Sequence, residues 1–449
     1  MTHSPEARAT ASGGEEFSNP RHSWRQYARA IGPGLISGAC DDDPSGIATY
    51  AQAGSQFGLS FLWTALFTFP LIAAIQEICD RTALATGMGF GELALKRFHR
   101  PGRLMVGIIL SVLIVANTLN IAADLVAIGS GMNLLNAGPT WIWALLAGIA
   151  ISFLLIKGSF NRIAQIFKVL AGTLVVYIIV MVAVTHNWQQ ILQYGVIPHI
   201  QLNKSYISVL VALLGTTISP YIFFWQSANR LEEMRDEPEG GSRVAPLTKR
   251  SRQDARFKQR TSRLDVFSGM AFSNIVMFAI IGTTGQTLHA HGITNIQSAA
   301  QAAGSLKPIA GSLASVIFAL GFIGSGLLAV PVLAASGSIG VSGLLGKKWG
   351  FSRKIREAPL FYILVVVGTI GGTALSLLNA NPISLLVFVA LINGIIAAPL
   401  LIFVLIISNS RHLMGDYVNG RVANLLGGFT FALMSGALIA LFATGGISI

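Results

Sequence analysis

Long apolar stretches separated by short polar connections run along almost the whole chain. A run of roughly 20 apolar residues is long enough to span a bilayer as a helix, and eleven runs near that length can be read from the sequence. They extend over Arg29–Phe57, Phe61–Thr86, Leu104–Met132, Trp141–Lys157, Ile163–Val184, Ser205–Arg230, Val266–Thr287, Ile309–Leu345, Pro359–Leu378, Ile383–Ser408 and Ala423–Ala443. The pattern predicts an all-α integral membrane protein with eleven transmembrane helices.

Two of these segments are interrupted by polar residues and a proline. The first contains DDDPSG at residues 41–46, and the sixth contains TTISP at residues 216–220. Proline removes a backbone donor and frees a carbonyl of the preceding turn, and an acid at bilayer depth is costly enough to indicate a function. Discontinuous helices in both halves of a chain point to a transporter's binding site. We therefore expect an ion site where these two breaks meet.

The positions of the breaks also predict how the helices are organised. Eleven helices of which the first and sixth are broken suggest two five-helix halves of opposite orientation and one further helix, a plan common among secondary transporters. The first 25 residues are rich in Ser, Gly, Glu and Arg and predict a disordered cytosolic tail. Residues 26–449 are then a single transmembrane transporter domain, in which residues 232–261 form a basic cytosolic loop.

Composition supports membrane insertion. Hydrophobic residues make up 53% of the chain and charged residues 11%, with a mean hydropathy of +0.64, whereas soluble domains carry about 25% charged residues. The net charge of +12 does not indicate nucleic-acid binding, because the basic residues lie between apolar segments and form no stripe with interleaved aromatics. Cys40 and Cys79 both lie in apolar segments, so we expect no disulfide framework.

Basic residues are distributed unequally between the two sets of connections. With a cytosolic N-terminus, the cytosolic connections hold Lys96, Arg97, Arg100 and Arg103, then Arg162, the run from Arg230 to Arg263, Lys347, Lys348, Arg353, Lys354 and Arg356, and finally Arg411 and Arg421. The opposite connections hold only Lys204 and Lys307. This bias predicts a multi-pass protein of the cell inner (plasma) membrane with its N-terminus in the cytosol. The basic loop at residues 232–261 either contacts anionic lipid headgroups, serves regulation, or simply anchors the topology.

Several motifs resemble those of the NRAMP divalent-metal transporters. The first helix reads GPG at 32–34, DPSGIAT at 43–49 and QAGSQFG at 52–58, where that family has Asp-Pro-Gly-Asn at the break. The similarity continues through Gln76 on the second helix and Asp124 on the third, and it extends over essentially the whole chain. It implies a leucine-transporter-like fold and transport of divalent metal ions.

The resemblance also implies a set of metal ligands. In the family an Asp and an Asn of the first helix, a Met of the sixth helix and backbone carbonyls near the breaks hold the metal. Carried over to this chain, Asp43 keeps the carboxylate, Gly46 replaces the Asn, Ser219 replaces the Met, and the Thr216 carbonyl keeps its place. Loss of the thioether removes a preference for transition metals, since Mg²⁺ accepts only oxygen ligands and retains its waters. The chain therefore resembles the NRAMP-related magnesium and manganese transporters most.

Residues associated with proton coupling are altered as well. The family's helix-6 histidine is Tyr221 here, and of the acidic pair on the third helix only Asp124 is kept, with Ala127 in place of the Glu. Tyrosine holds its proton far more tightly than histidine at neutral pH, so we expect little or no proton coupling. Asp41 and Asp42 are absent from the family pattern. Asp42 is predicted as a further ligand, and Asp41 is predicted to face an aqueous vestibule; either acid could instead supply a proton site.

Other polar residues in apolar segments have two interpretations each. Gln76 and Asn393 either face the site through water or form interhelical hydrogen bonds. Asp124 either lines a polar pathway or pairs with a neighbour such as Asn120. Asp80, together with Glu77 and Arg81, predicts a structural charge cluster at the end of the second helix, outside the site.

No catalytic motif, zinc-binding spacing or phosphate-binding loop is present, so we expect neither an enzyme nor a cofactor. The leading interpretation is an alternating-access transporter of Mg²⁺ and Mn²⁺, in which the metal is the transported substrate and the protein is a monomer. A proton-coupled transporter of Mn²⁺ and Fe²⁺ is the first alternative. A secondary transporter of small organic solutes is less compatible with three adjacent acids. A non-transporting membrane metal sensor or partner subunit is the alternative from another class.

Overall fold

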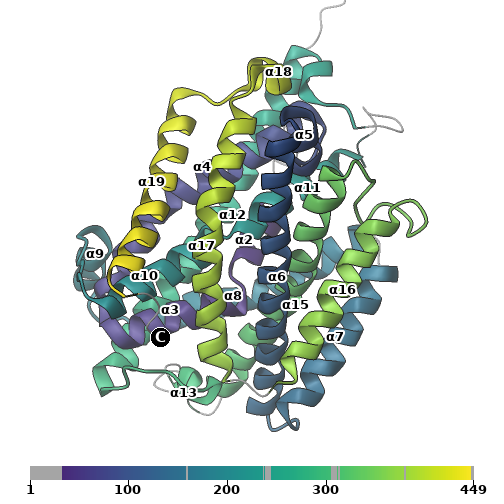
Figure 1. Ribbon diagram of the computed structural model, residues 1–449. Helices are drawn as coiled ribbons and strands as arrows, with labels where there is room; N and C mark the ends of the chain where they lie inside the picture. The colour runs from purple at the N-terminus through teal and green to yellow at the C-terminus, as the bar shows by residue number, and fades with distance from the viewer. Residues whose placement is uncertain are drawn as a thin grey trace, which may run out of the picture.

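The computed structural model describes residues 33–157, 160–235, 237, 244–304, 311, 314–378 and 381–445. The predicted tail over residues 1–25, and the expected starts of two helices at Arg29 and Ile309, lie outside the described residues. All regular structure within the described residues is helical (Figure 1). This part of the chain therefore has the all-α architecture that the hydropathy pattern predicts.

The long helices follow one another along the chain with mostly short connections. They are α2 (Pro33–Asp41), α3 (Pro44–Phe57), α4 (Leu62–Thr86), α6 (Arg100–Leu134), α7 (Thr140–Lys157), α8 (Phe160–Val184), α10 (Lys204–Thr217), α11 (Pro220–Arg235), α12 (Arg252–Thr287), α15 (Ala314–Leu344), α16 (Pro359–Ser376), α17 (Pro382–Ser408) and α19 (Arg421–Ala443). Connections contain the short helices α5 (Phe90–Arg97), α9 (Trp188–Val196), α13 (Ala299–Gly304) and α18 (Arg411–Met414), and the 3-10 turns η1 (Gly58–Phe61), η3 (Leu247–Lys249), η4 (His289–His291) and η6 (Gly415–Tyr417). Hydropathy did not predict the short helices because they cannot cross a bilayer.

Both predicted interruptions are present. The first helix is divided into α2, which ends at Asp41, and α3, which begins at Pro44. The sixth is divided into α10, which ends at Thr217, and α11, which begins at Pro220. Proline suits the first helical turn because an amide there would have no acceptor within the helix. Each break therefore lies immediately before a proline, as expected.

Ten stretches of the described residues are long and apolar enough to cross a membrane. The first stretch, Pro44–Thr86, joins α3, η1 and α4. It contains the second half of the first predicted segment together with the whole of the second, and α2 supplies the remaining half. These ten stretches and α2 account for the eleven predicted segments.

The connection predicted over residues 232–261 is shorter than expected. α11 continues to Arg235 and α12 begins at Arg252, so both ends of the predicted loop are helical. The difference arises because Arg, Lys, Glu and Gln end an apolar run but are good helix formers. Charged residues therefore extend α12 by several turns before its apolar part begins at Val266.

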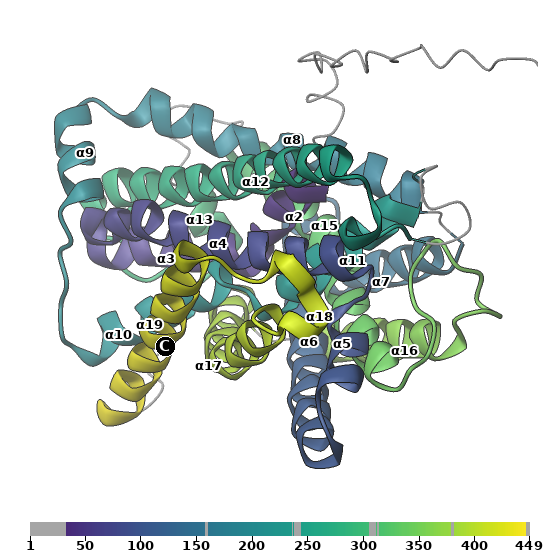
Figure 2. The ribbon, with the colours of Figure 1, turned by 90° about the horizontal axis from the view of Figure 1, so that it is seen from above.

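Helices in the interior differ from those at the periphery. Nearly every residue of α10 and α11 is buried, whereas most residues of α7 and α19 are exposed or only partly buried. α2 lies near the centre of both views, and α7, α16 and α19 lie at the outside (Figures 1 and 2). The two broken helices are thus enclosed by the others. The short helices α5 and α18 lie at one end of the molecule and α13 at the opposite end (Figure 1), as alternating membrane crossings require.

Close approach of α2 to α12 depends on glycine. A Cβ atom added at Gly38 would collide with the backbone of Gly269, and one added at Gly34 would lie 2.5 Å from the carbonyl carbon of Asp265. Small residues let helix backbones approach closely, which is a common mode of packing in membranes. α2 therefore lies directly against the backbone of α12.

The substitution Gly38→Ala should destabilise the protein, because its methyl group would force α2 away from Gly269. Overpacking of this kind typically costs about 1–3 kcal/mol, and we expect a lower midpoint of thermal denaturation in detergent. Gly428→Ala on α19 is the control, since a Cβ there meets no atom within 4 Å. An equal loss of stability in both variants would contradict this account of the packing.

Candidate functional site

Asp43 lies in the break of the first helix and caps α3. Its backbone is extended, with φ −68° and ψ 170°, and its Oδ1 accepts hydrogen bonds from the Gly46 amide at 2.7 Å and the Ser45 hydroxyl at 2.6 Å. Aspartate is favoured at this position because its carboxylate satisfies a free amide of the first turn. Oδ2 accepts a hydrogen bond from the Tyr221 hydroxyl at 3.2 Å. Residues of both broken helices therefore position this carboxylate, which is 1% exposed.

Two backbone carbonyls at the breaks lack their usual helical donors. In a continuous helix each carbonyl accepts from the amide four residues later, and the prolines that begin α3 and α11 have no amide hydrogen. The carbonyls affected are those of Cys40 and Thr216. Hydroxyl groups near the start of α11 bind them instead: Tyr221 donates to the Cys40 carbonyl at 3.3 Å, and Ser219 donates to the Thr216 carbonyl. At each break, therefore, a hydroxyl group replaces the missing amide donor.

Side chains connect the two breaks directly. The Ser45 and Thr216 hydroxyl oxygens lie 3.4 Å apart, and the Tyr50 and Thr217 hydroxyl oxygens lie 3.3 Å apart. Both pairs join α3 to the last turn of α10. Asp43 therefore lies between the carbonyl ends of the half-helices α2 and α10, where the partial negative charge of a helix C-terminus favours a cation.

Gly46 leaves the space beside Asp43 without a side chain. A Cβ atom added at Gly46 would lie 3.1 Å from Thr216 Oγ1 and 3.5 Å from Asp43 Oδ1. Any larger residue at this position would therefore project between the two breaks. The structure places Asp43, Gly46, Thr216 and Ser219 together, as the sequence predicts for four of the five proposed ligands.

Asp41 and Asp42 share a hydrogen-bond partner on α12. The Ser273 hydroxyl, on α12, lies 3.2 Å from Asp42 Oδ1 and 3.4 Å from Asp41 Oδ2. Both carboxyl groups are fully buried, so neither faces a solvent-filled vestibule in this conformation. The structure does not bring Asp42 into the hydrogen-bonded group around Asp43, and its role as a ligand stays a prediction.

The other polar residues predicted near the site are buried. Asn393 accepts a hydrogen bond from Asn120 at 3.0 Å, across α17 and α6. Asn120 therefore binds Asn393, whereas the carboxyl oxygens of Asp124 have no hydrogen-bond partner within the described part of the chain. The Gln76 amide likewise has none there. Interhelical bonding is confirmed for Asn393, while Asp124 and Gln76 remain available for a polar pathway.

The available donor atoms limit what the site can bind. Within the described residues no group of three or more His, Cys, Asp or Glu is arranged to hold a metal ion. A cation at Asp43 would therefore be held by at most two such side chains, together with carbonyl, hydroxyl and water oxygens. The Cys40 carbonyl was not among the predicted ligands, although its four-residue spacing to Pro44 identifies it. Ser45, Tyr50 and Ser273 were not predicted either, and the sequence contains no comparable signal for them.

A polar cavity of about 360 Å³ opens near the C-terminal end of α3 and the N-terminal end of α10. Its lining includes Gln52, Gln56, Ser208, Asn381 and Ser384. Gln52 follows Asp43 by nine residues, a distance of about 13 Å along a helix. None of the proposed ligands lines this cavity. The site is therefore closed toward it in this conformation.

Comparison with known proteins agrees with this geometry. The family described as natural resistance-associated macrophage protein-like, or Nramp, matches residues 34–444. The divalent metal cation transporter MntH of Yersinia enterocolitica serotype O:8 / biotype 1B is 26% identical over 418 residues, which cover 91% of this chain and 93% of that protein. The similarity thus extends across all the described helices.

Solved structures share the fold. The manganese transporter of Eremococcus coleocola, in complex with an aromatic bis-isothiourea substituted compound, has a TM-score of 0.74 at 15% identity and covers 96% of this chain and 88% of its own. Mhp1, a nucleobase-cation-symport-1 family transporter in a closed conformation, has a TM-score of 0.53 at 12% identity and covers 93% of this chain and 94% of its own. These similarities confirm the predicted leucine-transporter-like fold. Since the family match spans nearly the whole chain, the protein belongs to the Nramp family of membrane transporters.

Proposed function

We propose that the protein is an alternating-access transporter of divalent cations that carries Mg²⁺ and Mn²⁺ with weak discrimination and little or no proton coupling. Membership of a transporter family confirms that it is not an enzyme. Its relative in Yersinia is a divalent metal cation transporter, and its structural neighbour in Eremococcus is a manganese transporter. Both support divalent cations as the substrate class.

The observation that carries the Mg²⁺ proposal is that the side-chain partners of Asp43 are the Ser45 and Tyr221 hydroxyl groups. At the sixth-helix break a serine, Ser219, binds the Thr216 carbonyl where the Nramp pattern has a methionine. Oxygen ligands suit Mg²⁺, which also keeps several of its waters. The absence of a side chain at Gly46 leaves room for those waters. A site of this kind selects weakly between Mg²⁺ and Mn²⁺, because both accept oxygen ligands.

One thioether does lie beside the sixth-helix break. Met277 Sδ, on α12, lies 3.6 Å from the Thr217 hydroxyl oxygen. Asp43 makes its contacts with Ser45, Gly46 and Tyr221 instead. Met277 is therefore a natural control: we propose that its sulfur takes no part in metal selection.

Weak proton coupling is supported by the groups around Asp43. Its partner from α11 is Tyr221, whose hydroxyl donates to Asp43 and to the Cys40 carbonyl. A tyrosine in this position does not exchange protons readily near neutral pH. The alternative is a proton-coupled transporter of Mn²⁺ and Fe²⁺. It is favoured by Asp124, which is fully buried and has no hydrogen-bond partner in the described part of the chain.

Uptake into proteoliposomes tests both parts of the proposal. Mn²⁺ serves as the reporter and Mg²⁺ as the competitor, an enclosed dye reports the interior pH, and Asp43→Ala is compared with wild type. We expect Mg²⁺ to compete and the interior pH to stay constant, with all uptake lost in the variant. Mn²⁺ uptake that acidifies the interior and resists excess Mg²⁺ would instead identify the proton-coupled alternative.

We also propose that the protein lies in the cell inner (plasma) membrane as a monomer, with its N-terminus in the cytosol. The basic residues of the connection before α12 support contact with anionic lipid headgroups. Arg252, Arg256 and Arg260 are exposed at four-residue spacing on the first turns of α12, which places them on one face of the helix. Clustered basic residues at a membrane surface attract anionic headgroups.

A further inference from the structure

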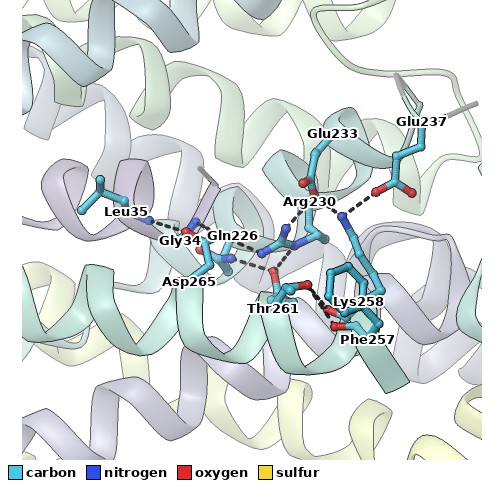
Figure 3. Close-up of polar contacts among 12 residues, drawn as sticks. Gly34, Leu35, Gln226, Arg230, Glu233, Glu237, Phe257, Lys258, Thr261 and Asp265 are labelled. Atoms are coloured by element: carbon cyan, nitrogen blue, oxygen red, sulfur yellow. Dashed lines mark hydrogen bonds and ion pairs between the residues drawn. The ribbon is translucent and has the colours of Figure 1, made fainter. Parts of the chain in front are cut away.

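A buried charge cluster lies at the N-terminal end of α2. Its centre is Arg230 on α11, whose side chain is 1% exposed. Arg230 Nε lies 2.7 Å from Asp80 Oδ1, and Nη2 lies 3.0 Å from Asp265 Oδ2. Nη1 lies 2.5 Å from Glu233 Oε2, which also binds Lys258 (Figure 3). One guanidinium therefore joins α11 to α4 and α12.

The partners of Asp80 differ from those that the sequence predicts, which were Glu77 and Arg81. Its neighbours Glu77 and Arg81 do form an ion pair with each other, at 3.1 Å. Asp80, however, accepts hydrogen bonds from Gln226 and Arg230 of α11. A buried guanidinium is stable only when carboxylates and further hydrogen bonds surround it. Asp80 belongs to the group around Arg230 and not to the Glu77–Arg81 pair.

Asp265 has a second partner in α2. Its Oδ2 accepts a hydrogen bond from the Gly34 amide at 2.7 Å, and its Oδ1 accepts from the Leu35 amide at 3.3 Å (Figure 3). The first amides of a helix have no acceptor within the helix, and a negative charge is favoured there. Asp265 therefore caps α2 while Arg230 holds Asp265 in place.

Two half-helices connect this cluster to the ion site. α2 extends from Pro33 to Asp41. The Gly34 amide lies in its first turn, and the Cys40 carbonyl and Asp43 lie at its other end. α11 begins next to Tyr221, which binds Asp43, and reaches Arg230 nine residues later. That separation is about 13 Å along a helix. The cluster therefore lies at the ends of α2 and α11 that are remote from the ion site.

We propose that Arg230 and Asp265 are positioning residues that form a latch: they hold α2 against α12 and α11 and keep the ion site closed at the end where α2 begins. Release of the α2 amides from Asp265 is the step that opens the site to that side. The inference rests on the proposed function, because it assigns a role in the transport cycle. Opening would also separate the close backbone packing of α2 on α12 at Gly38 and Gly269.

Cys40 is a built-in reporter of this opening. It is fully buried near the C-terminal end of α2, and release of α2 would expose it. In a Cys79→Ala background it is the only cysteine of the chain. The labelling rate of Cys40 by a fluorescent maleimide, in detergent and without metal, therefore measures the open fraction. Asp265→Asn removes the charge with little change in volume, and we expect labelling at least tenfold faster.

The matched control is Glu77→Gln. Glu77 is also mostly buried and ion-paired, but with Arg81 and Arg263, and it forms no ion pair with α2 or α11 in the described structure. Its loss should lower the thermal midpoint without changing Cys40 labelling. Equal acceleration by both substitutions, or none by Asp265→Asn, would overturn the latch.

This experiment separates the latch from the proposed function. Labelling needs no transported ion, so faster labelling in Asp265→Asn supports the latch even if uptake assays identify another substrate. Conversely, uptake of Mg²⁺ and Mn²⁺ by wild type with unchanged labelling in Asp265→Asn would leave the transport proposal intact and remove the latch.

Discussion

Replacing Asp43 with asparagine should reduce Mn²⁺ uptake into proteoliposomes at least about 100-fold, to the level of empty vesicles. Asparagine has nearly the same shape, and its oxygen can still cap the Gly46 amide, so the break should persist. What is lost is the negative charge of Asp43, whose carboxylate accepts hydrogen bonds from Ser45, Gly46 and Tyr221. Removal of one partner from a buried ion pair costs about 3–5 kcal/mol, and each 1.4 kcal/mol is a factor of ten.

The control for this prediction is Asp416→Asn. Asp416 is an exposed acid in η6, and its substitution should leave uptake unchanged. Size-exclusion profiles and thermal midpoints of both variants show whether each is folded. If Asp43→Asn retained more than a tenth of wild-type uptake while folded, Asp43 would not be the principal ligand, and Asp42 would become the first candidate.

The second prediction concerns metal selection. The double substitution Gly46→Asn with Ser219→Met should weaken competition by Mg²⁺ against Mn²⁺ uptake by about tenfold or more. A thioether is a poor ligand for Mg²⁺ and a better one for Mn²⁺ and Fe²⁺. An asparagine side chain would also enter the space next to Thr216 Oγ1, which lies 3.1 Å from a Cβ at position 46, and displace waters that Mg²⁺ retains.

The single variants and Met277→Leu complete this experiment. Ser219→Met alone should account for most of the change, because it restores the soft ligand. Met277→Leu should leave the competition unchanged, since its sulfur lies beside Thr217. Stronger Mg²⁺ competition in Met277→Leu would show that this thioether selects the metal, and undiminished competition in the double variant would contradict the proposed ligand set.

The location of the two helix breaks was predictable because the effect of proline is local. The prolines that follow Asp43 and Ser219 cannot donate to the carbonyls four residues earlier, whatever the rest of the chain does. The same four-residue spacing identifies the Cys40 carbonyl, which was not among the predicted ligands. The helix boundaries were less predictable at 232–261, since charged residues ended the apolar runs but continued α11 to Arg235 and α12 back to Arg252.

The partners of the acids were not predictable in this way. Asp42 was expected among the ligands, yet its carboxyl lies against Ser273, which is 231 residues away in the chain. Asp80 was assigned to a cluster with its neighbours, but it binds Arg230, 150 residues away. An acid's contacts depend on which helix packs beside it, and neither hydropathy nor spacing contains that information.

By itself, then, the sequence determined the membrane helices, the two breaks and the oxygen-rich character of the site, because hydropathy and the missing proline amides act within a few residues. Only the tertiary structure decided which carboxylate faces the site and which ones hold the helices. Asp43 is positioned by Tyr221 of α11, and Asp265 caps α2 from α12. These roles arise from packing between distant segments, whose close approach at glycines such as Gly38 sets the position of each buried charge.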